Sequence, residues 1–135
     1  MSGSKGDNVE LEHIALYVND LEAIKNFYVW HFQATPNQKY HNPRTGLETY
    51  FLSFSGGARL EIMRRPDMSE KSAGEHPLGY AHISFKVGST EKVDELTQQL
   101  QQAGCPLLNG PRMTGDGYYE SVLTDPEGNM IELVA

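Results

Sequence analysis

The sequence has few of the features that mark secreted, membrane-bound or nucleic-acid-binding proteins. Its 135 residues contain one cysteine, Cys105, so an intramolecular disulfide cannot form, and a reducing, cytoplasmic setting is favoured. No apolar run is long enough to cross a bilayer, and the small, polar residues at the start do not resemble a signal peptide. Lys and Arg number 11 against 18 Asp and Glu, and the net charge of −7 argues against nucleic acid or an anionic membrane surface as a partner.

The length and composition fit one compact domain with a modest core. The hydrophobic fraction of 39% is sufficient for a core in a chain of this length. We expect a single domain over residues 9–135, preceded by a disordered tail at residues 1–8. Within the domain we expect a first module at 9–63 and a second at 79–135. Residues 64–78, rich in charges, Ser, Gly and Pro, are expected to form a linker.

The most informative pattern is an internal repeat. Leu-Glu-His-Ile-Ala-Leu-Tyr-Val at the start of the first module is echoed by Tyr-Ala-His-Ile-Ser-Phe-Lys-Val in the second. Ala-Arg-Leu-Glu-Ile-Met is echoed by Asn-Met-Ile-Glu-Leu-Val. His82 follows His13 by 69 positions, and Glu132 follows Glu61 by 71. Each copy therefore supplies one imidazole and one carboxylate, and four ligands of this mixed type suit a divalent metal.

Hydrophobic periodicity and turn residues predict the order β-α-β-β-β in each half, although the second strand of each is weakly marked. In the first half we expect a strand at 9–18, a helix capped by Asp20, an irregular segment or short edge strand within 33–47, and a hairpin of 48–54 with 58–63. In the second half we expect a strand at 80–87, a helix capped by Ser89 or Thr90 and ended by Gly104, a short strand at 106–109, and a hairpin of 118–124 with 129–134.

Strand alternation predicts where the four candidate ligands point. In each of the four strands concerned, branched or aromatic residues occupy one face, and the histidine or glutamate occupies the other. We expect the apolar faces to pack on the helices and the four polar side chains to share the opposite, concave face. A slip of one residue would bury the charges, so the strand register should be strongly fixed.

The repeated segments, together with the final Thr-Asp-Pro-Glu-Gly-Asn-Met-Ile-Glu-Leu, resemble the vicinal oxygen chelate superfamily and within it the glyoxalase I (lactoylglutathione lyase) branch. The resemblance covers nearly the whole chain from residue 9 and is strongest from Gly79 onward. It implies an α+β fold of two βαβββ modules that curl into a cup, and a homodimer. Whether both modules of one chain form a site, or modules pair between chains, stays open.

The resemblance also implies roles for individual residues. His13, Glu61, His82 and Glu132 would be metal ligands, with Glu132 as the base that moves a proton and Glu61 as the second catalytic carboxylate. Bacterial members of the branch hold glutathione with an arginine and an asparagine, at the positions that Tyr17 and Arg65 occupy here. These two residues and Arg112 are the candidate substrate-binding residues. Arg112 belongs to the segment 111–119, which we expect to be either a plain hairpin connection or a loop that closes over the substrate.

Two carboxylates would neutralise a divalent cation and leave positions open for a substrate with adjacent oxygens. Mixed nitrogen and oxygen ligation suits Ni, Co, Mn or Zn. We expect a metal-dependent lyase that converts the hemithioacetal of methylglyoxal and a thiol into a thioester of lactate. The alternatives are another enzyme of the superfamily (an epimerase or a ring-cleaving dioxygenase), a protein that sequesters a small molecule without catalysis, or a structural zinc site.

Several residues are expected to be structural. Three histidines fall outside the repeat, in the late first helix or in loops, and are expected to be surface or capping residues: His31, His41 and His76. Cys105 is expected to be a small packed residue rather than a nucleophile. Trp30 and Phe32 are expected to fill a core or an interface. The segment 125–128 is expected to be a turn with solvated acidic residues.

Overall fold

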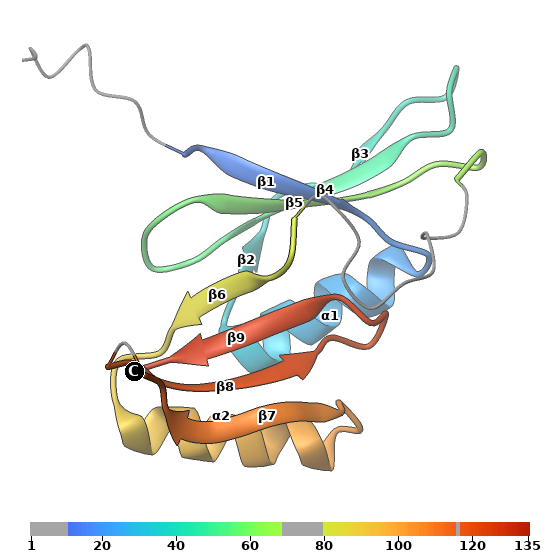
Figure 1. The fold of residues 1–135 in the computed structure, drawn as a ribbon. Coiled ribbons are helices and arrows are strands. Elements are labelled where there is room, and N and C mark those ends of the chain that lie inside the picture. The colour runs from blue at the N-terminus through green and yellow to red at the C-terminus, as the bar shows by residue number, and fades with distance from the viewer. Residues whose placement is uncertain (1–10, 69–79, 116) are drawn as a thin grey trace, which may run out of the picture. The chain divides into compact units, whose positions relative to one another are not determined.

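The computed structural model describes residues 11–68, 80–115 and 117–135 (Figure 1). The chain divides into two compact units, Met1–Met68 and Ser69–Ala135, which we call unit 1 and unit 2. In the described ranges each unit contains one helix and one sheet, so the α+β fold class predicted from the sequence is confirmed. Neither of these helices is long and apolar enough to span a membrane.

Some predictions fall on residues that the structure does not describe. The tail expected at residues 1–8, the first two residues of the strand expected at 9–18, residues 69–78 of the linker, and His76 all lie outside the described ranges. The predicted cup concerns the arrangement of the two units, and it stays a prediction.

Unit 1 consists of a strand, a helix and four further strands. They are β1 (His13–Tyr17), α1 (Leu21–Phe32), β2 (Thr35–Pro36), β3 (Tyr40–His41), β4 (Glu48–Ser53) and β5 (Arg59–Arg64). The sheet order is β1-β5-β4-β2, with β3 also beside β4. The first and last strands of the unit, β1 and β5, run parallel, whereas the other pairs are antiparallel.

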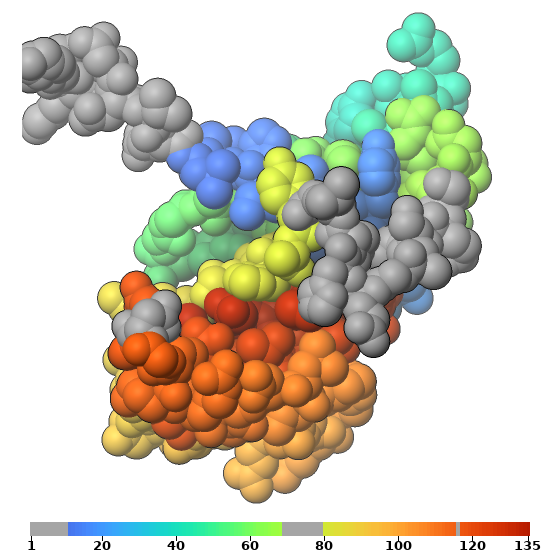
Figure 2. All heavy atoms as spheres, in the orientation of Figure 1, coloured from blue at the N-terminus to red at the C-terminus, as the bar shows by residue number. Residues whose placement is uncertain are grey.

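Unit 2 repeats this arrangement with one strand fewer. Its elements are β6 (Ile83–Lys86), α2 (Thr90–Gln102), β7 (Leu107–Met113), β8 (Tyr119–Thr124) and β9 (Met130–Val134). The sheet order is β6-β9-β8-β7, and again the first and last strands, β6 and β9, are parallel. Helix α2 packs against β7, β8 and β9, and Figure 2 shows the atoms of α2 and of the neighbouring strands closely packed.

Both helices begin at the predicted caps. The side chain of Asp20 accepts a hydrogen bond from the backbone N–H of Ala23 at 3.0 Å, and Ser89 accepts one from Lys92 at 3.1 Å. Each bond satisfies a backbone donor that has no partner within the helix. Gly104 follows the end of α2 with a φ of +97°, in the left-handed region expected of a helix-terminating glycine.

The apolar face of each sheet lies against its helix, as strand alternation predicted. In β5, Leu60 and Ile62 are buried, and in β9 so are Ile131 and Leu133. The edge strands β1 and β6 have half-buried apolar residues on the corresponding face and exposed residues between them. Because this face is fixed by burial, the side chains at alternate positions of the same strands point to the opposite face.

The structure differs from the sequence predictions mainly at the weakly marked strands. Residues 33–47 contain two short strands, β2 and β3, rather than one, and His41 lies in β3 rather than in a loop. The strand expected to end at residue 109 continues to Met113 as β7, and β5 extends to Arg64. Two register shifts against β8 accommodate the Gly-Pro pair within β7, which is an edge strand where proline is tolerated. Gly110 is required there, since a Cβ at this position would lie 2.6 Å from the carbonyl oxygen of Glu120.

The turn between β8 and β9 forms as predicted, but one of its acidic residues is not solvated. Asp125 is 1% exposed. Its Oδ1 accepts hydrogen bonds from the backbone N–H groups of Glu127 and Asn129, both at 2.9 Å, and the amide of Asn129 donates to both of its oxygens. The carboxylate therefore replaces water as the acceptor for the turn, and this explains its burial.

We predict that Asp125→Ala destabilises the protein by about 2–3 kcal/mol, because two backbone donors and one side-chain amide lose a charged acceptor. The free energy of unfolding would be measured by urea denaturation followed by circular dichroism. Glu95→Ala is the matched control: its carboxylate is 69% exposed and pairs with Lys92 at 3.7 Å, so its loss should cost less than about 0.5 kcal/mol. Equal losses in the two variants would contradict the structural role of Asp125.

Candidate functional site

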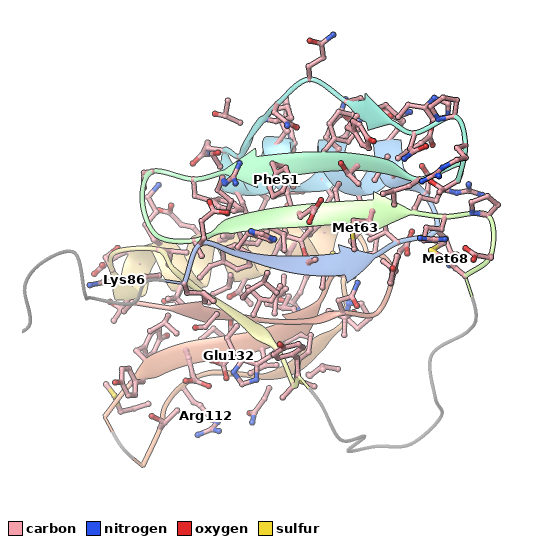
Figure 3. The ribbon with its side chains drawn as sticks, turned by 90° about the horizontal axis from the view of Figure 1, so that it is seen from above. Phe51, Met63, Met68, Lys86, Arg112 and Glu132 are labelled. Carbon is pink, nitrogen blue, oxygen red and sulfur yellow. The ribbon has the colours of Figure 1, made fainter. Side chains whose placement is uncertain are left out.

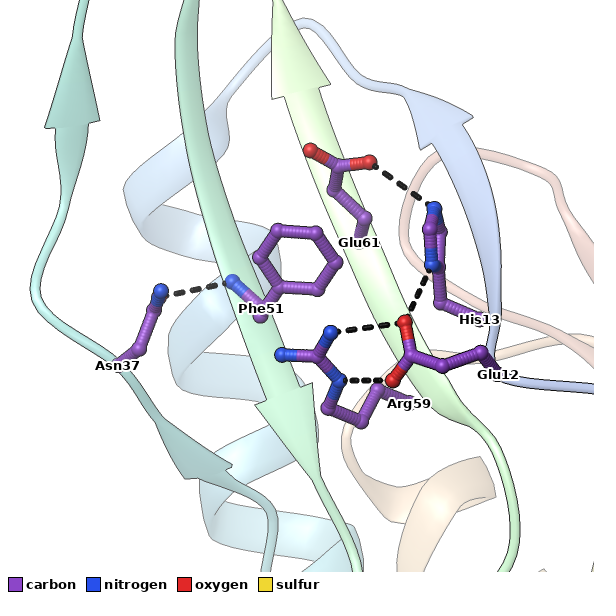
Figure 4. Close-up of polar contacts among 6 residues, drawn as sticks. All are labelled: Glu12, His13, Asn37, Phe51, Arg59 and Glu61. Atoms are coloured by element: carbon purple, nitrogen blue, oxygen red, sulfur yellow. Dashed lines mark hydrogen bonds and ion pairs between the residues drawn. The ribbon is translucent and has the colours of Figure 1, made fainter.

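The two candidate ligands of unit 1 face each other across paired strands. In the parallel register of β1 and β5, Ala15 lies opposite Glu61, so His13 and Glu61 are offset by two residues on the same face. The Nε2 atom of His13 lies 3.7 Å from Oε1 of Glu61 (Figure 4). The His13 side chain is 40% exposed and that of Glu61 is 17% exposed, so the pair is reachable from solvent.

The candidate ligands of unit 2 form an equivalent pair. Ser84 lies opposite Glu132 in the register of β6 and β9, which gives His82, one residue before β6, the same offset from Glu132. The Nε2 atom of His82 lies 3.3 Å from Oε1 of Glu132, and the side chains are 37% and 17% exposed. The internal repeat is therefore a repeat of local geometry as well as of residue type.

The atoms of each pair have the chemistry of two ligands of one ion, and the 3.3 Å separation in unit 2 also has their spacing, whereas the 3.7 Å separation in unit 1 is slightly longer. Imidazole nitrogens and carboxylate oxygens bind divalent metals at roughly 2.1 Å, and two such ligands at tetrahedral or right angles are about 3.0–3.4 Å apart. Within residues 11–68, 80–115 and 117–135, no group of three or more His, Cys, Asp or Glu side chains is gathered closely enough to hold a metal ion. Convergence of the two pairs on one ion stays a prediction.

Sequence reasoning did not identify the surroundings of His13. Glu12 Oε1 lies 2.7 Å from His13 Nδ1, and Arg59 donates to both oxygens of Glu12. The hydrogen bonds from Arg59 and then from His13 lower the pKa of Glu12 to about 2. The residue type gave no signal for this contact, because Glu12 and Arg59 are far apart in the sequence and meet only through the pairing of β1 with β5.

Two of the candidate substrate-binding residues lie at one end of the same sheet. Tyr17 is opposite Met63, so Arg65, just after β5, stands at the same two-residue offset from Tyr17 as Glu61 from His13. Tyr17 is 57% exposed. Arg65 is engaged with Asp67, to which its Nε donates at 2.9 Å, and this ion pair lowers the pKa of Asp67.

The third candidate, Arg112, lies in a strand rather than in the expected loop. It belongs to β7 and is opposite Glu120 of β8, and its Nε donates to the side chain of Asn109 at 3.1 Å. Strand β7 is the edge strand opposite β6 and is separated from β9 by β8. The side chain of Arg112 is exposed, and Figure 3 labels it together with Glu132 of β9. The first part of the expected loop, with Arg112, is therefore the end of β7, and the chain after Met113 connects β7 to the antiparallel strand β8. A substrate-binding role for Arg112 stays a prediction.

The remaining expectations are partly met. Cys105 is buried, and burial followed by the charge of Asp125 raises the pKa of its thiol, as expected of a packed cysteine. His31 is partly buried against Phe27, and burial lowers its pKa. Trp30 is 76% exposed and does not fill the core of unit 1.

The chain is similar to known proteins over almost its full length. The family model described as Glyoxalase/Bleomycin resistance protein/Dioxygenase superfamily matches residues 10–133. The uncharacterized protein YqjT of Bacillus subtilis is 27% identical over 93% of this chain and 98% of its own length. A crystal structure of a glyoxalase family protein from Enterococcus faecalis is 26% identical, with a TM-score of 0.76 over 93% of this chain and 97% of that chain.

Glyoxalase I of Leishmania major has the same fold at 22% identity, with a TM-score of 0.72 over 94% of this chain and 86% of that chain. The similarity at this identity concerns the fold alone. The match of the family model, in contrast, extends over nearly all of the sequence and includes His13, Glu61, His82 and Glu132. The chain therefore belongs to the Glyoxalase/Bleomycin resistance protein/Dioxygenase superfamily.

Proposed function

We propose that the protein is a metal-dependent lyase of the glyoxalase I type. It would isomerise the hemithioacetal formed by an α-oxoaldehyde, such as methylglyoxal, and a thiol into a 2-hydroxyacyl thioester. The observation that carries the proposal is the equivalence of the two His–Glu pairs, with Nε2 to Oε1 separations of 3.7 and 3.3 Å and glutamates exposed to the same extent. The superfamily membership and the glyoxalase I fold of Leishmania major support it further.

In this proposal one divalent ion (Ni, Zn, Co or Mn) is held by four ligands, His13, Glu61, His82 and Glu132. The four ligands come from one chain or from two. Two carboxylates balance the charge of the ion, and two neutral imidazoles complete the set. When bound, the ion would act as a Lewis acid that makes the C–H group beside the substrate carbonyl more acidic.

The protein's own residues would move the proton. Glu132 would take the proton from the carbon that bears sulfur, which gives an enediolate, and return it to the neighbouring carbon. No atom is gained or lost, so the product is an isomer of the hemithioacetal. The Glu132 side chain is only 17% exposed, which limits exchange of the carried proton with water. Glu61 occupies the equivalent position in unit 1 and is the second candidate for proton transfer.

Binding of the thiol part would fall to the exposed polar residues on the ligand-bearing face. Tyr17 and Arg65 lie at one end of that face in unit 1, and a guanidinium there suits a carboxylate of glutathione or another thiol. We also propose a homodimer, in which a second copy would cover exposed apolar side chains such as Trp30.

We predict that the purified protein binds one divalent ion per chain and that His13→Ala and His82→Ala each weaken binding on the order of 100-fold or more, since each removes one of four ligands. Affinity would be measured by competition with a coloured chelator. His41→Ala is the matched control, because His41 is an exposed histidine of β3 outside the pairs. An effect confined to one of the two pairs would contradict a shared site.

We predict that Glu132→Gln lowers kcat for thioester formation by roughly 10²–10⁴-fold, because glutamine cannot accept the proton. The assay would follow thioester absorbance with methylglyoxal and either glutathione or cysteine, using metal-loaded protein and Glu95→Gln as the control for charge. Full turnover by the Glu132→Gln variant would show that another residue is the base. Metal-loaded protein that turns over neither hemithioacetal would overturn the lyase proposal in favour of an epimerase, a dioxygenase or a sequestering protein.

A further inference from the structure

Unit 1 contains a cluster around His13 that the repeat does not reproduce in unit 2 (Figure 4). Glu12 Oε1 lies 2.7 Å from Nδ1 of His13, the ring nitrogen that points away from Glu61. Arg59 holds the same carboxylate through two bonds, Nε to Oε2 at 2.7 Å and Nη2 to Oε1 at 2.8 Å. The backbone N–H of Arg59 also donates to the carbonyl oxygen of Glu12 at 2.9 Å.

The arginine is itself held in place by an aromatic ring. The guanidinium carbon of Arg59 lies 4.1 Å from the centroid of the Phe51 ring, a cation–π contact. The Phe51 ring in turn meets the His13 ring edge-to-face, with centroids 5.2 Å apart. These contacts run from Glu12 through Arg59 and Phe51 back to His13. The imidazole is therefore constrained at Nδ1 by Glu12 and at its ring by the edge-to-face contact with Phe51.

The cluster determines which nitrogen of a neutral His13 carries the proton. A carboxylate that receives two bonds from a guanidinium is ionised and only accepts hydrogen bonds. The 2.7 Å contact with Glu12 therefore requires the hydrogen on Nδ1 of His13. A neutral imidazole has only one such hydrogen, so the lone pair is on Nε2, which faces Oε1 of Glu61 at 3.7 Å. Two acceptors facing each other at this distance favour a cation between them.

The corresponding positions of unit 2 lack these groups. Ala81 precedes His82 where Glu12 precedes His13, and Met130 stands two residues before Glu132 where Arg59 precedes Glu61. Val122 lies opposite Glu132 where Phe51 lies opposite Glu61. The fold and the His–Glu pair therefore form without the cluster, so the cluster serves His13 rather than the architecture of the sheet.

We propose that Glu12, anchored by Arg59, is a positioning residue that fixes His13 as the Nδ1–H tautomer and presents Nε2 to the metal ion. This inference deepens the proposed function and rests on it for the part that concerns the metal. It makes the pair in unit 1 the preorganised half of the site. Hydrogen bonds of this kind to a ligand histidine raise metal affinity by roughly 10–100-fold.

The direct test is the tautomer of His13 in metal-free protein, read from the ¹⁵N shifts of its two ring nitrogens by NMR at mildly alkaline pH. We expect a protonated Nδ1 and an unprotonated Nε2 in the wild type, and a shift toward the Nε2–H tautomer in Glu12→Ala. Glu95→Ala removes a carboxylate of similar exposure, 69% against 61% for Glu12, and should leave His13 unchanged. A wild-type His13 protonated at Nε2, or a Glu12→Ala variant that keeps the Nδ1–H tautomer, would overturn the proposal.

Metal affinity provides the second measurement, by chelator competition on the same proteins. We expect Glu12→Ala to bind metal roughly 10–100-fold more weakly and Glu12→Gln, which keeps an oxygen acceptor for Nδ1, to recover most of the loss. Equal losses in both variants would show that the charge and not the hydrogen bond matters, contrary to the proposal. If the wild type binds no metal, the proposed function fails, whereas the tautomer measurement still decides what Glu12 does to His13.

Discussion

The parallel pairing of the first and last strand in each unit is the constraint on which the candidate site depends. It places each histidine and glutamate on neighbouring strands with an offset of two residues. Burial of Leu60 and Ile62 in one sheet, and of Ile131 and Leu133 in the other, fixes which face carries them. A slip of one residue in β5 or β9 would turn its glutamate toward the helix and bury a carboxylate without a partner. The strand register that buries the apolar residues is therefore also the register that places each histidine and glutamate on the opposite face.

The two units share their ligand positions but not the environment of those ligands. Unit 1 surrounds its histidine with a carboxylate, a guanidinium and an aromatic ring, whereas unit 2 has alanine, methionine and valine at the same places. Both units keep the His–Glu pair and the buried apolar positions of the strand that carries the glutamate. The groups around the two histidines differ, so unit 1 holds its histidine through a carboxylate that unit 2 lacks at the same position.

The sequence allowed the fold class, both helix caps, the faces of the strands and the two His–Glu pairings to be predicted, since each follows from local periodicity or from the repeat. Three features required the structure. The contact of Glu12 with Arg59 depends on long-range strand register. The extension of β7 through a Gly-Pro pair depends on its edge position and on bulges that accommodate both residues. The burial of Asp125 depends on a turn that folds around its carboxylate. Convergence of the two pairs stays a prediction.

That convergence is tested most directly by anomalous diffraction at the absorption edge of the metal, from crystals of the metal-loaded protein. The account predicts one anomalous peak per chain, bounded by Nε2 of His13 and His82 and by carboxylate oxygens of Glu61 and Glu132, contributed by one chain or by two. A peak bound by one His–Glu pair alone, or located away from both pairs, would contradict it.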